Sequence, residues 1–137
     1  MANEKLGLVI SDYNADITHL MGKIATEHAE FLGAKVEKTI RVPGAFDMPL
    51  AVNSLVKRKD INGVVALGAV IEGDTKHDEI VAHNVARKIA DLSVQSGKPV
   101  SLGVSGPGMT RADGVKRIDG YAKRSVESAL KMIRRLK

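Results

Sequence analysis

Cysteine and tryptophan are absent from this 137-residue sequence, and its only aromatic side chains belong to two tyrosines and two phenylalanines. The absence of cysteine excludes disulfide bonds and thiolate chemistry. No apolar run reaches the length of about 18 residues that a membrane-spanning helix needs, so no membrane association is predicted. The length suits one domain covering residues 1–137, and the lack of a secretion signal favours a cytoplasmic protein.

Charges of one sign do not gather in blocks. The sequence has 21 Lys and Arg and 16 Asp and Glu, which gives a formal net charge of +5, and the two signs are interleaved. Proteins that bind nucleic acids usually carry a basic block or stripe, so this pattern predicts no nucleic-acid partner. A small positive excess instead suits an anionic small-molecule substrate.

Short apolar runs alternate with segments of helical periodicity. This alternation predicts an α/β fold of the flavodoxin-like type: a three-layer sandwich with a four-stranded parallel sheet and helices on both faces. The strand at 36–42 carries charged residues and is expected at an edge, whereas the strand at 63–71 is the most apolar and is expected in the middle. The predicted strands are 6–10, 36–42, 63–71 and 100–104, and the predicted helices are 16–32, 47–59, 77–96 and the region after 110.

Several boundaries are expected from local signals. The second helix should begin near Asp47, because the following proline is tolerated only in a first turn. The third helix is expected to bury a face that includes Ile80. Residues 105–108 are expected to form a loop ahead of an N-cap at Thr110, and the last helical region is expected to break around Gly120.

Polar and aromatic residues follow each predicted strand. They occupy residues 12–14, 44–47, 72–77 and 105–111. Ligands in open parallel sheets bind outside the carboxyl ends of the strands, where helix N-termini and loops converge. Two of the four aromatic residues, Tyr13 and Phe46, fall on this edge, which is therefore the expected functional site.

His77 stands at the start of a predicted helix. The helix dipole favours a neutral ring there, and a neutral imidazole can accept or donate a proton in catalysis. A surface or helix-capping histidine fits the same position, so the residue alone does not decide between the two. Phe46 beside Asp47 likewise suits either a flat heterocycle with polyol hydroxyls or a hydrophobic plug on the sheet end.

Two glycine-containing turns, 73–75 and 106–108, could present backbone N–H groups to a phosphate. Neither matches a P-loop, and no GxGxxG motif follows the first strand, so ATP and NAD are not predicted as cofactors. Four basic residues could clamp a phosphate or simply face water. These four are Arg111, Arg117, Lys123 and Arg124.

Three motifs occur in order at this edge: Tyr13-Asn14, VPGAFD at 42–47 and GAVIEGDTKH at 68–77. Together they resemble the lumazine synthase family over essentially the whole chain, and GPGMTR at 106–111 resembles its archaeal branch. The resemblance implies a transferase of riboflavin biosynthesis that joins 5-amino-6-(D-ribitylamino)uracil to 3,4-dihydroxy-2-butanone 4-phosphate. The products are 6,7-dimethyl-8-ribityllumazine and phosphate, and the family uses neither a metal nor an organic cofactor.

The resemblance also implies roles for individual residues. His77 matches the proton-transfer residue. Substrate binding is implied for Tyr13, Ala45, Phe46, Asp47, Ala69, Val70, Ile71 and Leu102, and phosphate binding for Asp74, Thr75, Arg117 and Arg124. The sequence departs from the bacterial pattern in that Asp47 replaces a glutamate and Leu102 an aromatic residue. Lys123 is an alternative to Arg124 for the basic position of the last helix.

The family's assembly is implied in the same way. Pentamers share each site between neighbouring subunits, and many members close twelve pentamers into a sixty-subunit icosahedral capsid, in some cases with riboflavin synthase as a partner. Two alternatives stay open on the sequence. The chain could be an archaeal-type riboflavin synthase, a paralogue that dismutates two lumazines, or a non-catalytic shell protein that binds a flavin or a phosphate.

Overall fold

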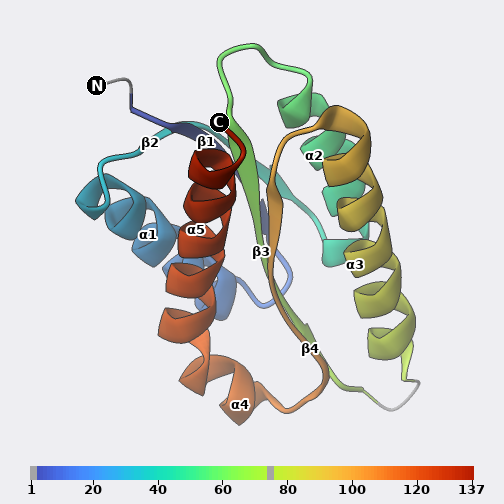
Figure 1. Cartoon of the computed structure of the whole chain (residues 1–137). Coiled ribbons are helices and arrows are strands. Elements are labelled where there is room, and N and C mark those ends of the chain that lie inside the picture. The colour runs from blue at the N-terminus through green and yellow to red at the C-terminus, as the bar shows by residue number, and fades with distance from the viewer. Residues whose placement is uncertain (1–2, 74–75) are drawn as a thin grey trace.

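The computed structural model describes residues 3–73 and 76–137. A four-stranded sheet with strand order β2-β1-β3-β4 forms its middle layer, and every pairing in this sheet is parallel (Figure 1). The elements are β1 (Lys5–Ser11), α1 (Ala15–Phe31), β2 (Lys35–Val42), η1 (Ala45–Asp47), α2 (Met48–Val56), β3 (Gly63–Ile71), α3 (His77–Ser96), β4 (Val100–Met109), α4 (Arg111–Lys116) and α5 (Ile118–Arg135).

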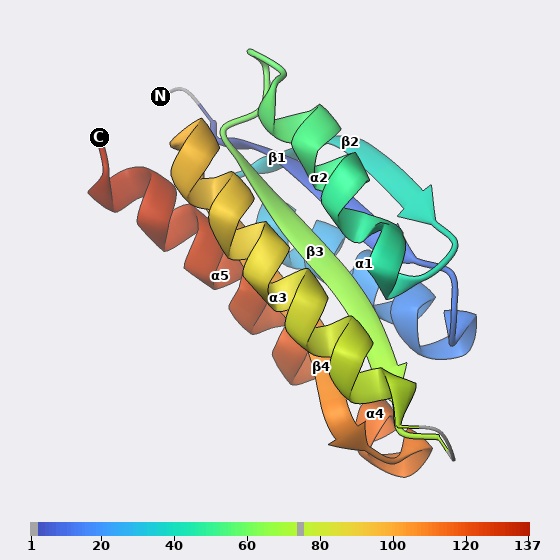
Figure 2. The same cartoon turned by 90° about the vertical axis from the view of Figure 1, so that its right-hand side faces the viewer.

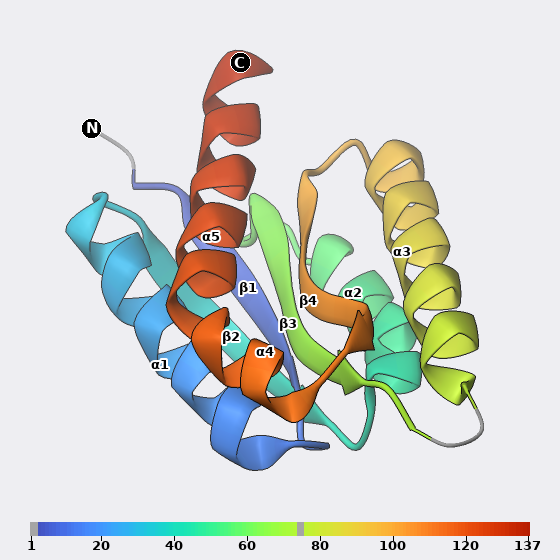
Figure 3. The same cartoon turned by 90° about the horizontal axis from the view of Figure 1, so that it is seen from below.

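Helices cover both faces of the sheet. Figure 1 shows α1 and α5 on one face and α2 and α3 on the other, and the end-on view in Figure 3 separates the same layers. Two hydrophobic cores lie between the sheet and these helix pairs. The three-layer α/β sandwich predicted from the sequence is therefore confirmed.

The central strands β1 and β3 divide their side chains between the two cores. Leu8 packs in the core beneath α1 and α5, and its neighbour Val9 packs in the core beneath α2 and α3. A Cβ built on Gly7 would stand 2.9 Å from Cδ1 of Leu55, so the glycine lets α2 approach the sheet closely. Figure 2 shows α2 and α3 running across this face. Burial on both faces explains the continuous apolar runs of these strands.

The strand β2 lies at the edge of the sheet, as its charges predicted. Lys35, Lys38 and Arg41 are exposed on it, and Lys5 of the neighbouring strand reaches Glu37 at 3.7 Å. The strand β2 pairs with β1, and the register of this pairing shifts between Leu6 and Gly7 of β1.

The strand β4 is longer than the sequence predicted. Residues 105–108, expected as a loop, continue the strand to Met109, which pairs with Ile71 and accepts a hydrogen bond from the N–H of Glu72 at 2.9 Å. The register shifts between Ala69 and Ile71, so this stretch is irregular but remains between residues paired with β3. Thr110 is the N-cap, as predicted, because its side chain accepts a hydrogen bond from the N–H of Asp113.

Three further expectations were wrong. The final helical region breaks at Arg117, with φ −96° and ψ 0°, while Gly120 lies inside α5 beneath the side chain of Arg124. The helix α2 ends at Val56 rather than at residue 59. Ile80 is 65% exposed, because Ala82, Val85 and Ile89 form the buried face of α3. None of the helices in the described ranges is long and apolar enough to span a membrane.

Candidate active site

The strand order creates a crevice at the carboxyl end of the sheet. The chain leaves β1 toward β2 on one side and leaves β3 toward β4 on the other, so β1 and β3 flank the point where the winding direction reverses. Ligands of doubly wound α/β proteins bind at this point. A cavity of about 350 Å³ lies there, lined by Tyr13, Asn14, Ala45, Ala69, Val70, Ile71, His77, Asp78 and Val81.

The turn after β1 brings Tyr13 and Asn14 to the cavity. The N–H of Tyr13 donates to the carbonyl of Pro43 at 3.0 Å, which joins this turn to the turn after β2. Asn14 has a φ of 62°, a left-handed conformation that asparagine tolerates well, and its Nδ2 donates to the carbonyl of Ala69 at 3.0 Å. Tyr13 is 77% exposed, so its ring is open to a ligand.

The turn after β2 contributes Ala45 to the cavity wall. Asp47 closes this turn, because its Oδ2 accepts a hydrogen bond from the N–H of Gly44 at 3.0 Å. Phe46 is 58% exposed on η1 next to this bond. Its ring therefore does not plug the end of the sheet, and Phe46 and Asp47 flank the cavity rather than line it.

His77 is the first residue of α3 and lines the cavity beside Asp78 and Val81. Exposed at the helix start, its ring is accessible from solvent. The carboxyl end of β3 lies opposite, with residues 69–71 in the same cavity. The arrangement places an exposed aromatic ring, a strand end with backbone hydrogen-bonding groups and an imidazole around one small space.

Leu102 and Arg124 lie elsewhere on the chain. They line a separate hollow of about 370 Å³ between β4 and α5, together with Tyr121. The guanidinium carbon of Arg124 lies 5.6 Å from the centre of the Tyr121 ring, a cation–π distance. Arg117 is exposed between α4 and α5 and does not line the His77 cavity. The expected site residues are therefore not all brought together within one chain: Leu102, Arg117 and Arg124 lie away from the His77 cavity.

Arg111, one of the four candidate phosphate clamps, is already paired. Its guanidinium forms an ion pair with Asp16 and donates to Oδ1 of Asn14 at 3.3 Å. The hydrogen bond from Arg111 holds the pKa of Asp16 below its ordinary value. This pairing joins the start of α4 to the turn after β1 and occupies the guanidinium of Arg111.

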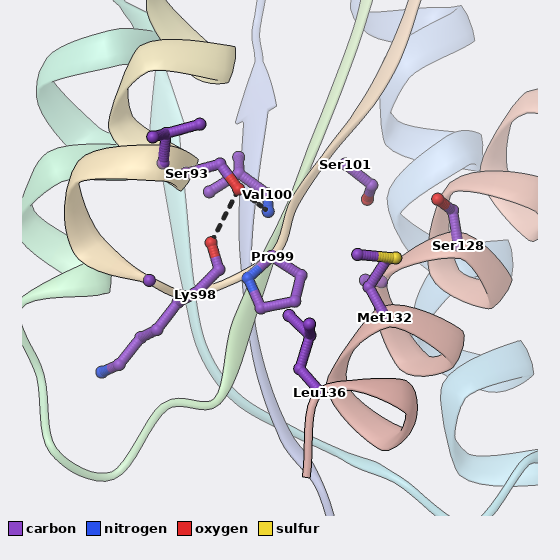
Figure 4. A pocket seen from close by; sticks show the side chains of 11 residues that line it. Ser93, Lys98, Pro99, Val100, Ser101, Ser128, Met132 and Leu136 are labelled. Carbon is purple, nitrogen blue, oxygen red and sulfur yellow. Dashed lines mark hydrogen bonds between the residues drawn. The ribbon is translucent and has the colours of Figure 1, made fainter.

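Another cavity, of about 300 Å³, lies at the opposite end of the sheet between α3, β4 and α5 (Figure 4). Two of its polar side chains bind backbone carbonyls: Oγ of Ser93 donates to the carbonyl of Lys98 at 2.9 Å, and Nζ of Lys98 donates to the carbonyl of Arg58 at 2.6 Å. Pro99, Met132 and Leu136 give it an apolar wall. It lacks the convergence of strand ends and a helix start that the His77 cavity has.

Asp74 and Thr75, expected to bind phosphate, lie outside the described residues. Within the described residues, no cluster of three or more His, Asp or Glu side chains is arranged to hold a metal ion. Three residues that line the cavity, Asn14, Asp78 and Val81, were not among the site residues expected from the sequence. Asn14 and Asp78 adjoin assigned residues, but ordinary turn and first-turn positions favour the same residue types, so no sequence signal distinguished them.

Fold and site together define a doubly wound α/β protein with a small-molecule site at its topological switch point. The family described as 6,7-dimethyl-8-ribityllumazine synthase matches residues 3–137, and this chain belongs to that family.

Curated relatives carry the same description. The protein of Methanocaldococcus jannaschii is 61% identical over 132 residues, which cover 96% of this chain and 93% of that protein. The protein of Methanoculleus marisnigri is 60% identical over 96% of this chain and 97% of its own length. The protein of Archaeoglobus fulgidus is 56% identical over 100% of this chain and 95% of its own length. The resemblance inferred from the three motifs is confirmed, including its archaeal character.

Proposed function

We propose that this chain condenses 5-amino-6-(D-ribitylamino)uracil with 3,4-dihydroxy-2-butanone 4-phosphate to form 6,7-dimethyl-8-ribityllumazine and phosphate. The observation that carries the proposal is the single cavity that brings together Tyr13, the end of β3 at 69–71 and His77. Membership of the family supports the same reaction.

The flat uracil is proposed to stack on Tyr13. Tyr13 is exposed at the cavity, and its backbone N–H is bonded to the turn after β2, which fixes the point from which the ring extends toward a ligand. Backbone groups of Ala69, Val70 and Ile71 would bind the edge of the heterocycle. Phe46 and Asp47 would contact the ribityl chain, with the carboxylate of Asp47 accepting from its hydroxyl groups.

The reaction needs proton transfers, which we assign to His77 because this residue lines the cavity. The 5-amino group attacks the ketone, and loss of a water gives an imine. Phosphate then leaves by elimination, the resulting enol becomes a ketone, and the ribityl-bearing nitrogen closes the ring with loss of a second water. His77 would move protons in the dehydration and elimination steps, where a positioned acid or base contributes about 10²- to 10⁴-fold.

The phosphate end of the site is proposed to come from a neighbouring subunit. Arg117, Arg124 and Leu102 do not reach the His77 cavity of their own chain. A cyclic homo-oligomer would bring these residues of one subunit to the cavity of the next through a heterologous interface. We propose a homopentamer, in which Asp74 and Thr75 would contribute backbone contacts to the phosphate.

We also propose that the pentamers assemble further. Ile80, Val94 and Leu102 are large apolar side chains exposed on α3 and β4, which suits burial between copies of the chain. We propose that pentamers close into a sixty-subunit shell in the cytoplasm and that riboflavin synthase is a candidate partner. Analytical ultracentrifugation distinguishes pentamer from shell directly.

The proposed activity is tested by mixing purified protein with both substrates and a no-enzyme control. Faster appearance of the lumazine absorbance with stoichiometric phosphate release is the expected result. Folded, assembled protein without this acceleration would contradict the proposal and favour a non-catalytic binding protein. Riboflavin formed from the lumazine alone would instead identify the riboflavin synthase paralogue.

A further inference from the structure

Asp78 is a buried carboxylate beside the cavity that no step of the proposed reaction uses. It follows His77 in the first turn of α3 and is only 7% exposed, whereas the next residue, Glu79, is exposed. Burial of a carboxylate costs free energy unless hydrogen bonds compensate for the lost water. The burial of Asp78 therefore requires a specific partner.

That partner is the backbone of the glycine turn, the irregular part of β4 at residues 106–108, opposite which the register with β3 shifts. Gly108 donates its N–H to Oδ2 of Asp78 at 2.9 Å, across 30 positions of sequence. Gly108 has a φ of 69° and Gly106 a φ of 109°, conformations that favour glycine. The hydrogen bond thus joins the first turn of α3 to a glycine turn whose backbone shape other residues would strain.

The glycine turn also contacts β3, the strand whose end lines the cavity. A Cβ built on Gly106 would stand only 2.3 Å from the carbonyl oxygen of Val70, so the two backbones are in direct contact. Val70, His77 and Asp78 line the same cavity. One hydrogen bond of Asp78 therefore connects the helix that carries His77 with the turn that supports Val70.

We propose that Asp78 is a positioning residue for the His77 site: its carboxylate holds the turn at 106–108 against the start of α3 and so fixes His77 relative to Val70. The inference rests on the proposed function, because it assigns Asp78 to the geometry of that site. The Gly108 N–H and the positive end of α3 stabilise the inward-facing carboxylate. Misplacement of a reacting group by about 1 Å can cost on the order of 100-fold in rate.

The test compares two substitutions of Asp78. Asp78→Ala removes the acceptor, and we expect kcat to fall roughly 10- to 100-fold, with a much smaller change in KM. Asp78→Asn keeps an oxygen of the same shape that can accept from Gly108, and should restore most of kcat. Glu79→Gln is the matched control, because it removes a negative charge from the same helix turn and should leave kcat unchanged.

Hydrogen–deuterium exchange supplies a readout independent of turnover. Exchange at the Gly108 amide should accelerate in Asp78→Ala and remain slow in Asp78→Asn and Glu79→Gln. If Asp78→Ala does not fold, Asp78→Ser replaces it, since its shorter hydroxyl cannot span the same distance to Gly108.

The turnover rate of the wild-type protein distinguishes failure of the proposed function from failure of the inference about Asp78. An inactive wild-type protein refutes the proposed function and this inference with it. An active wild type overturns this inference alone if Asp78→Ala keeps the wild-type kcat and loses only thermal stability. Equally low kcat values for Asp78→Asn and Asp78→Ala would also overturn this inference, because the negative charge rather than the hydrogen bond would then be required.

Discussion

Arg134 of α5 and Glu4, 130 positions apart in sequence, form a two-bond ion pair that ties the last helix to the start of the sheet. Nε of Arg134 donates to Oε2 of Glu4 and its Nη2 to Oε1, both at 3.0 Å. The side chain of Glu4 is only 10% exposed. The hydrogen bond from the Arg134 guanidinium lowers the pKa of Glu4 from its ordinary value.

This pair should make the protein sensitive to acid. Because the pKa of Glu4 is lower in the folded chain, its stabilisation is present above the unfolded carboxyl pKa of about 4.3 and is lost as the pH falls through the folded value. We expect Glu4→Gln to lower the free energy of unfolding by about 1 kcal/mol at neutral pH, a modest value because Arg134 is half-exposed and screened by water.

Urea unfolding at neutral and acidic pH, at one protein concentration, measures this effect. The difference between wild type and Glu4→Gln should shrink in acid, while the exposed Glu30→Gln serves as a control with little effect at either pH. An equal loss of stability at both pH values would contradict the role assigned to the ion pair.

His77→Ala should slow turnover without abolishing it. Loss of a positioned acid or base lowers the rate by about 10²-fold or more. Holding two oriented substrates together still supplies up to about 7 to 11 kcal/mol of the barrier reduction, so the rate should stay above the no-enzyme control. The measurement is kcat at saturating substrates, with His83→Ala on the exposed surface of the same helix as the control. An assembled His77→Ala protein without any activity would refute the prediction that orientation of the two substrates supplies part of the rate.

Arg117→Ala should chiefly raise the KM for the sugar phosphate. Arg117 is exposed between α4 and α5, so its side chain can be truncated without opening a core. A charged contact to phosphate contributes about 1.5 to 3 kcal/mol, which corresponds to a change of roughly 10- to 100-fold. Steady-state kinetics with the sugar phosphate varied measures it, and Lys116→Ala, one position earlier, should behave as wild type. A fall in kcat with unchanged KM would place Arg117 in the chemical step instead.

Two impaired variants should restore activity to each other when assembled together. If His77 of one subunit and Arg117 of its neighbour complete one site, random co-assembly of His77→Ala and Arg117→Ala chains leaves about a quarter of the sites intact, half times half. The proteins are unfolded, mixed in equal amounts, refolded and assayed at low sugar phosphate. A mixture no more active than the mean of its separately refolded components would show that each chain supplies both residues to its own site.

Most helices and strands could be predicted because their signals, apolar runs, helical periodicity and turn residues, lie within each segment. The apolar run at 63–71 coincides with β3, and the proline at the start of α2 marked its first turn. The extension of β4 to Met109 could not be read locally, because it depends on pairing with Ile71 of another strand. The break at Arg117 was missed for a similar reason: the burial of Ile118 and Ala122 sets the direction of α5, and Gly120 is accommodated inside it.

The candidate site was predictable as an edge of the sheet but not as a set of contacts. Parallel strands bring Tyr13, Ala45, Ala69 and His77 to one end whatever the details of packing, and they line one cavity. Whether Leu102 reaches that cavity depends on the position of β4 at the far edge of the sheet. Sequence spacing carries no such information, since it does not fix which strands are neighbours.

The charged residues of β2 have a consequence for the behaviour of the protein at high concentration. An edge strand exposes unpaired backbone groups that can recruit strands from other chains and start aggregation. Lys35, Lys38 and Arg41 are exposed on β2, so a copy added in register would place like charges opposite one another and destabilise the pairing. Strand addition at this edge is therefore disfavoured even where copies of the chain are concentrated.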